Sequence, residues 1–157
     1  MELRTFKPEE TAEIGRRLGQ ACHGGEVLAL TGELGAGKTL FIKGLAMGLE
    51  VTDPDEVVSP SFIILREHKG RVPLYHLDFY RLENPRELTE LGIEEYFYGT
   101  GVCAVEWADK FPEILPEARL EILIEIEGEE TRRLTFTPRG RNYETLLAQV
   151  GIVTNET

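Results

Sequence analysis

The residues best suited to chemistry form a glycine-rich stretch, Gly32-Glu33-Leu34-Gly35-Ala36-Gly37-Lys38-Thr39. This stretch has the pattern G-x-x-x-x-G-K-[ST] at every fixed position, and it lies between an apolar run typical of a strand and a segment with helical periodicity. Glycines let successive backbone N–H groups turn inward around an anion, and the following helix directs its positive dipole end to the same place. The pattern predicts a loop that binds nucleotide phosphates.

Two side chains of this loop would contact the nucleotide and its metal. Lys38 would reach the β- and γ-phosphates, and the hydroxyl of Thr39 would bind Mg²⁺, a hard cation that prefers oxygen ligands. The alternative interpretation is a glycine-rich turn with an exposed lysine. The predicted nucleotide-binding residues are Glu33, Leu34, Gly35, Ala36, Gly37, Lys38, Thr39 and Leu40.

A nucleotide-hydrolysing site also needs an acid at the C-terminal end of a neighbouring strand. Asp78 ends the run "LYHLD", which His76 interrupts, and Glu106 ends the wholly apolar run "VCAVE". By this pattern Glu106 is the better acid for the metal, and Asp78 could orient either the attacking water or a water in the outer shell of the metal. The two assignments could be reversed, and either acid could instead cap a following helix.

Two further segments are candidates for switching or partner contact. Ser59 and Ser61 flank Pro60, which biases the segment away from helix, so these hydroxyls could sense a γ-phosphate or belong to an ordinary turn. Trp107 directly follows Glu106, where it could pack over the site, offer a partner an anchor or lie in the core.

Buried apolar strands that alternate with helical segments predict an α/β fold with three layers and a mainly parallel central sheet. Two late segments, 118–128 and 131–138, alternate with period 2 and predict an antiparallel flank. Asn84 and Pro85 suit the start of a helix over 84–97. The other expected strands cover 2–6, 26–32, 101–107 and a pair joined around 69–70; helices are expected over 7–22, 38–49 and 142–150, and a short helix or turn over 109–116.

Composition limits the classes of function. A chain of 157 residues suits a single domain, 1–157, and a formal charge of -11 spread along the chain argues against direct nucleic-acid binding. Cys22 and Cys103 are far apart in sequence and are expected to be buried thiols in a reducing compartment. No signal peptide or apolar run of ~18 residues is present, so we expect a cytoplasmic protein without membrane contact.

Four motifs in order resemble the TsaE family, also called YjeE, of small P-loop ATPases. Family members have "GDLGAGKTTF", "SPTF", "HLDLYR" and an "EW" pair, and this chain has "GELGAGKTLF", "SPSF", "HLDFYR" and "VEWA". The resemblance covers most of the chain. It implies a P-loop NTPase fold, ATP as the nucleotide, and a requirement in the synthesis of threonylcarbamoyladenosine (t6A) in bacterial tRNA.

The resemblance also implies roles for individual residues. Lys38 and Thr39 would serve the phosphates and Mg²⁺, Glu106 would join the metal site, Asp78 would be needed for activity, and Trp107 would matter for function or partner contact. Thr11, in a region similar to the family's Thr-x-x-x-Gly segment, would lie near the nucleotide. The implied partners are the TsaD and TsaB subunits, with tRNA bound only through them. The chain departs from the family pattern at Glu33, Leu40, Ser61 and Phe79.

Three functions remain open from the sequence. The first is an ATPase that resets a partner complex, with a low intrinsic rate because no arginine finger or water-positioning glutamine is identifiable. The second is a small-molecule kinase, which would need a cationic lid; the pairs Arg16-Arg17 and Arg132-Arg133 lie in no recognisable lid insertion. The third is a module that binds nucleotide only to adopt an assembly-competent shape.

Overall fold

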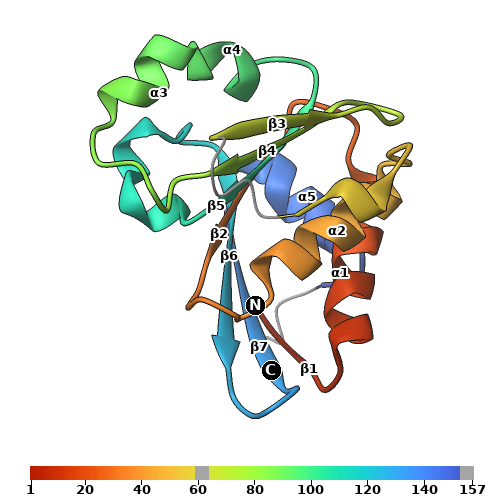
Figure 1. Ribbon diagram of the computed structural model, residues 1–157. Helices are drawn as coiled ribbons and strands as arrows, with labels where there is room; N and C mark the ends of the chain where they lie inside the picture. The colour runs from red at the N-terminus through yellow and green to blue at the C-terminus, as the bar shows by residue number, and fades with distance from the viewer. Residues whose placement is uncertain (59–63, 153–157) are drawn as a thin grey trace.

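The computed structural model describes residues 1–58 and 64–152, and in this part of the chain seven strands form one sheet (Figure 1). The strand order is β1-β7-β6-β2-β5-β4-β3. The strands are β1 (Glu2–Thr5), β2 (Val27–Thr31), β3 (Leu65–His68), β4 (Leu74–Asp78), β5 (Val102–Glu106), β6 (Arg119–Ile126) and β7 (Arg132–Arg139).

The centre of the sheet is parallel and its flanks are antiparallel. Strand β2 pairs in parallel with both β5 and β6, and β4 pairs in parallel with β5. Strands β3, β7 and β1 each join a neighbour in antiparallel register. This arrangement confirms the predicted α/β class with a mainly parallel centre and an antiparallel flank.

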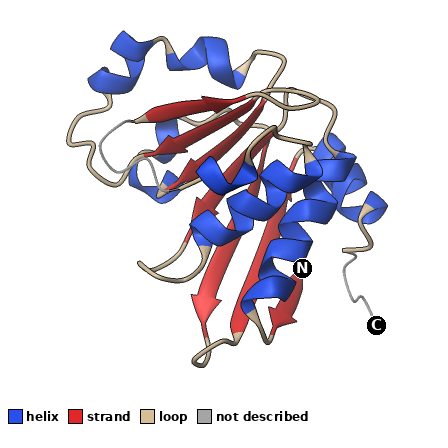
Figure 2. Cartoon of the chain, turned by 45° about the vertical axis from the view of Figure 1, so that its right-hand side comes forward, coloured by secondary structure: helices blue, strands red, loops and turns tan. Residues whose placement is uncertain are grey.

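Helices cover both faces of the sheet, so the fold has three layers. Figures 1 and 2 show α1, α2 and α5 on one side of the sheet, and α3 and α4 beside β3 and β4 on the other. Alternate residues of β2 enter different cores: Leu28 and Leu30 pack with α1 and α2, while Val27 and Ala29 pack with α3 and α4. The helices are α1 (Pro8–Ala21), α2 (Lys38–Gly48), α3 (Arg86–Leu91), α4 (Ile93–Phe97) and α5 (Arg141–Gln149); 3₁₀ turns cover η1 (Pro54–Glu56), η2 (Ala108–Lys110) and η3 (Pro112–Ile114).

The predicted single helix over 84–97 is wrong, because the chain forms two shorter helices there. Gly92 has a left-handed φ of 76° and separates α3 from α4. A left-handed glycine ends a helix by letting the next N–H groups bond back to the last carbonyls. The helix also begins one residue later than expected, at Arg86, whose N–H donates to Oδ1 of Asn84 at 2.9 Å.

Both cysteines are buried, as the sequence predicts. Cys22 and Cys103 are both buried free thiols, and burial raises the pKa of Cys103 to about 12. Within residues 1–58 and 64–152, none of the helices has the length and apolar character needed to cross a bilayer.

Candidate nucleotide site

The glycine-rich loop connects the carboxyl end of β2 to the first turn of α2. Gly37 is the residue before the helix and has a φ of 110°, a backbone conformation that residues other than glycine rarely adopt. At the start of the loop, a Cβ on Gly32 would lie 2.5 Å from the carbonyl oxygen of Ile124 on β6. The glycines are therefore required by the backbone path and by the closeness of the neighbouring strand.

Lys38 begins α2 and points back into the loop. Its Nζ donates to the carbonyl oxygens of Gly32 at 2.6 Å and Glu33 at 3.0 Å. The same nitrogen lies 4.2 Å from the centre of the Trp107 ring, in cation–π geometry. Burial lowers the pKa of the Lys38 ammonium, and nearby carboxylates, first that of Glu106, oppose this shift.

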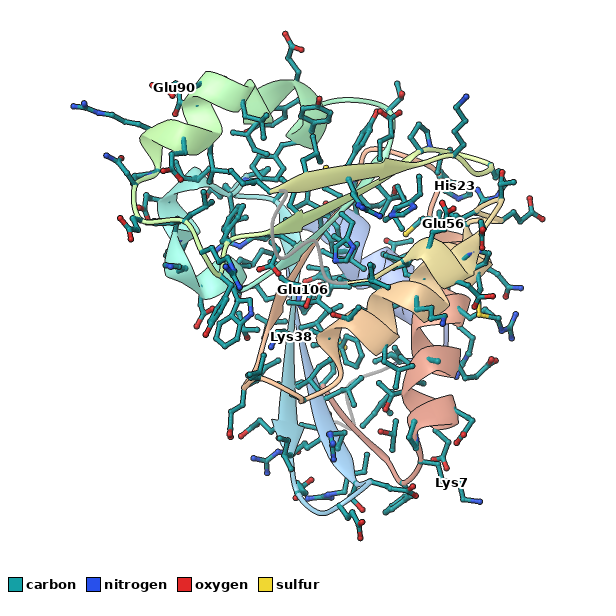
Figure 3. All side chains as sticks on the ribbon, in the orientation of Figure 1. Lys7, His23, Lys38, Glu56, Glu90 and Glu106 are labelled. Carbon is teal, nitrogen blue, oxygen red and sulfur yellow. The ribbon has the colours of Figure 1, made fainter. Side chains whose placement is uncertain are left out.

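Glu106 ends β5 and is only 3% exposed, yet its carboxylate has donors on two sides. The hydroxyl of Thr39 donates to Oε1 and Oε2 at 3.0 and 3.1 Å. The Nε2 atom of His76 lies 2.6 Å from Oε2. In Figure 3, Lys38 and Glu106 lie near each other where α2 meets the sheet.

Asp78 lies beside Glu106, because β4 and β5 are parallel neighbours and these two residues are paired in register. Its side chain is mostly buried, and its Oδ1 accepts a hydrogen bond from the N–H of Tyr80 at 2.9 Å. The structure thus brings Lys38, Thr39 and both acids to the same edge of the sheet. Glu106 is the acid in contact with Thr39.

Trp107 sits directly after Glu106 and adopts a left-handed backbone conformation with φ 56°. Its ring packs against the ring of Tyr80, with 4.9 Å between centroids, and Tyr80 is 49% exposed. A non-glycine residue in this conformation is uncommon and marks a site of local strain. Here the strained turn places an aromatic surface beside the Lys38 ammonium.

The other predicted site residues fall into four groups. Thr11 on α1 is buried, its hydroxyl lies 2.6 Å from that of Thr5, and its Cγ2 is 4.0 Å from where a Cβ of Gly37 would be. Leu34 is 77% exposed at the tip of the loop. Ser59 and Ser61 lie outside the described residues. Of the remaining positions, Glu33, Gly35 and Ala36 lie in the loop between β2 and α2, and Leu40 lies in the first turn of α2.

The donor set at this edge fits a magnesium ion. Mg²⁺ usually takes one or two protein oxygens and completes its shell with waters and substrate phosphates. The Thr39 hydroxyl and the Glu106 carboxylate would supply two such oxygens beside the glycine-rich loop. Among the described residues, no group of three or more His, Cys, Asp or Glu could hold a metal ion.

Two residues at the site had no assigned role in the sequence interpretation. His76 stands out only as a polar residue inside an otherwise apolar strand, and the contact with Glu106 depends on the pairing of β4 with β5. Arg132 begins β7, and its Nε donates to the carbonyl oxygen of Ala36 at 2.9 Å. No local pattern signals this contact, because the two residues are 96 positions apart.

Comparisons with known proteins agree with these observations. A family described as "Threonylcarbamoyl adenosine biosynthesis protein TsaE" matches residues 5–134. The tRNA threonylcarbamoyladenosine biosynthesis protein TsaE of Bacillus subtilis (strain 168) is 46% identical over 151 residues, which cover 96% of this chain and 93% of that protein. The protein of the same name from Treponema pallidum (strain Nichols) is 39% identical over 127 residues, which cover 81% of this chain and 93% of that protein.

A solved structure has the same fold. The crystal structure of YdiB from Bacillus subtilis superposes with a TM-score of 0.81 at 42% sequence identity, covering 96% of this chain and 93% of that chain. Together with the family match, these similarities show that the chain belongs to the TsaE family.

Proposed function

We propose that this protein is an Mg²⁺-dependent ATPase that serves the formation of t6A in tRNA. TsaE family proteins take part in t6A biosynthesis. The observation that carries the ATPase assignment is the contact between the Thr39 hydroxyl and the Glu106 carboxylate beside the glycine-rich loop. In P-loop ATPases, a hydroxyl and a strand-terminal acid placed in this way hold the magnesium of the bound nucleotide.

Each residue would have a separate task in the reaction. Lys38 would exchange its bonds to the carbonyls of Gly32 and Glu33 for bonds to the β- and γ-phosphates. Thr39 and Glu106 would hold Mg²⁺, which would offset the negative charge of the phosphates. Asp78, beside Glu106 at the sheet edge, would orient the attacking water.

We expect the isolated protein to hydrolyse ATP slowly. An arginine finger accelerates phosphoryl transfer by about 10³- to 10⁵-fold. The arginine at this loop is Arg132, and most of its N–H groups are already used in hydrogen bonds to backbone carbonyls. A partner would then complete the site, and TsaD and TsaB are the proposed partners. These partners would bind the tRNA, in the cytoplasm. This suits a chain whose net charge of -11 disfavours direct contact with RNA phosphates.

The test is phosphate release from ATP by the purified protein with Mg²⁺, first alone and then with TsaB, TsaD and tRNA. We expect a slow basal rate, strong stimulation by the partners and loss of both in Lys38→Ala. Release that the partners do not stimulate would contradict the cycling role. Transfer of the γ-phosphate to a metabolite would instead indicate a kinase.

The second candidate is a passive module, which binds nucleotide to change shape and does not hydrolyse it. In its favour, Lys38 and Thr39 already have hydrogen-bond partners within the protein, and a bound nucleotide would replace these partners. Asp78→Ala separates the two candidates in a reconstituted t6A assay. The ATPase requires that this variant still assembles with its partners but no longer cycles. Full t6A formation by Asp78→Ala would favour the passive module.

A further inference from the structure

Arg132 and Arg133 are adjacent in sequence but serve different faces of the sheet. Arg133 pairs with Glu125 across the β6–β7 ladder, with 3.1 Å between Nη2 and Oε2, and both side chains are partly exposed. Arg132 points to the opposite face, where the glycine-rich loop lies. The loop and the hairpin formed by β6 and β7 are neighbours in Figure 1, where the hairpin extends past the loop.

The guanidinium of Arg132 is bonded to backbone carbonyls from two segments. On the loop side, Nε donates to Ala36 at 2.9 Å, and Nη2 lies 3.5 Å from the carbonyl oxygen of Gly35. On the hairpin side, Nη1 donates to the carbonyls of Gly128 at 2.9 Å and Thr131 at 3.0 Å. Arg132 forms no ion pair with any residue in the ranges 1–58 and 64–152, and the hydrogen-bond acceptors that it contacts there are backbone carbonyls.

This contact bears on how the loop presents its N–H groups. In a planar trans peptide the C=O and the N–H point in opposite directions. The peptide that joins Ala36 to Gly37 has its carbonyl held toward Arg132, so its N–H is directed to the other side of the loop. An anion nest requires several N–H groups that converge in this way.

We propose that Arg132 is a positioning residue that braces the glycine-rich loop against the β6–β7 turn in its anion-binding shape. This inference rests on the proposed function, since it assumes that the loop binds nucleotide. Arg132 acts through the loop backbone, because its donors are used on carbonyls of the protein. Its planar fork reaches two segments at once, which a lysine ammonium cannot reproduce.

The test compares Arg132→Gln and Arg132→Lys with the matched control Arg133→Gln, which removes only the exposed pair with Glu125. The first readout is amide hydrogen exchange of the loop peptide, 32–37, in the nucleotide-free protein. The second is the dissociation constant for ATP and for ADP, measured with Mg²⁺.

In Arg132→Gln we expect the loop amides to exchange hydrogen faster than in the native protein. We also expect this variant to bind both nucleotides about tenfold more weakly, the effect of losing roughly one charge-assisted hydrogen bond. Arg132→Lys should lie between Arg132→Gln and native, and Arg133→Gln should match native in both readouts. If Arg132→Gln fails to fold, the same comparison is made with Arg132→Lys, whose exchange and binding must differ from native.

Two results separate failure of this inference from failure of the proposed function. Native loop exchange and native affinity in both Arg132 variants would overturn the brace while leaving nucleotide binding intact. If the native protein bound no nucleotide, the proposed function would fail and this inference with it, and faster loop exchange in Arg132→Gln than in Arg133→Gln would then show only that Arg132 holds the loop backbone.

Discussion

The carboxylate of Glu106 is held by the protein from two directions, and His76 is the less expected of its two donors. A carboxylate only accepts hydrogen bonds, so Nε2 of His76 carries the proton of the 2.6 Å bond. The other ring nitrogen, Nδ1, is buried and has no partner among the described residues. Leaving such an atom unpaired costs about 1–3 kcal/mol, which offsets part of the stability that the bond to Glu106 contributes.

We predict that His76→Leu raises the Mg²⁺ concentration needed for half-maximal ATP binding by about tenfold, the size of effect seen when outer partners of metal ligands are removed. His76→Gln should restore part of this loss, because an amide N–H can donate to the same oxygen. The measurement is ATP affinity as a function of Mg²⁺ concentration.

The control for this series is His68→Leu. His68 is another buried histidine whose Nε2 has no partner in the described part of the chain. The His68→Leu substitution should leave the Mg²⁺ dependence of ATP binding unchanged. Equal shifts in the His76 and His68 variants would show that burial of a histidine, and not the bond to Glu106, matters.

At the scale of elements, the crossing of α1 and α2 sets where the glycine-rich loop ends. A Cβ on Gly44 of α2 would lie 1.9 Å from the carbonyl oxygen of Ala12, and a Cβ on Gly15 of α1 would lie 2.2 Å from that of Phe41. The two helix backbones are therefore in direct contact through glycine. Since α2 begins at Lys38, this crossing also fixes the position of the lysine and of Thr39.

Gly44→Ala is predicted to destabilise the protein by about 3 kcal/mol, because the backbone obstacle cannot move as a side chain would. In an exposed helix the same change would stabilise by about 1 kcal/mol, so the sign of the effect reports the crossing. Urea unfolding measures the free energy difference. Gly128→Ala is the control: it has only ordinary contacts with Thr131, and a comparable loss there would contradict the argument.

Sequence patterns predicted the elements well because periodicity and turn residues act over short distances. The strand that ends at Glu106 and the helix that begins at Lys38 were both expected from the sequence alone. The break at Gly92 was missed, since a glycine inside a helical pattern either continues the helix or ends it. The contacts of His76 and Arg132 depend on which strands are neighbours, and no local pattern contains that information.

At the scale of the whole molecule, the interior holds two thiols that ionise less readily than in water. Burial raises the pKa of Cys103 from an ordinary 9.0 to about 12, and it raises the pKa of Cys22 as well. Above pH 9 the unfolded chain would lose these protons while the folded protein keeps them. The unfolded state then binds fewer protons, so stability falls as pH rises.

We therefore predict that the free energy of unfolding decreases between about pH 9 and 12, by up to about 1.4 kcal/mol per pH unit for each thiol. Urea unfolding at a series of pH values measures the slope. The double variant Cys22→Ala, Cys103→Ala should show a smaller slope over the same range. Identical slopes in the two proteins would mean that the thiols do not contribute.

The measurement that tests the central claim most directly is calorimetric titration of ATP into the native protein, with Mg²⁺ and with a chelator, alongside Lys38→Ala and Glu106→Gln. We expect native protein to bind ATP more tightly with Mg²⁺, Glu106→Gln to lose most of this difference, and Lys38→Ala to bind weakly in both conditions. Binding that neither substitution alters would place the nucleotide elsewhere and would contradict the assignment of this site.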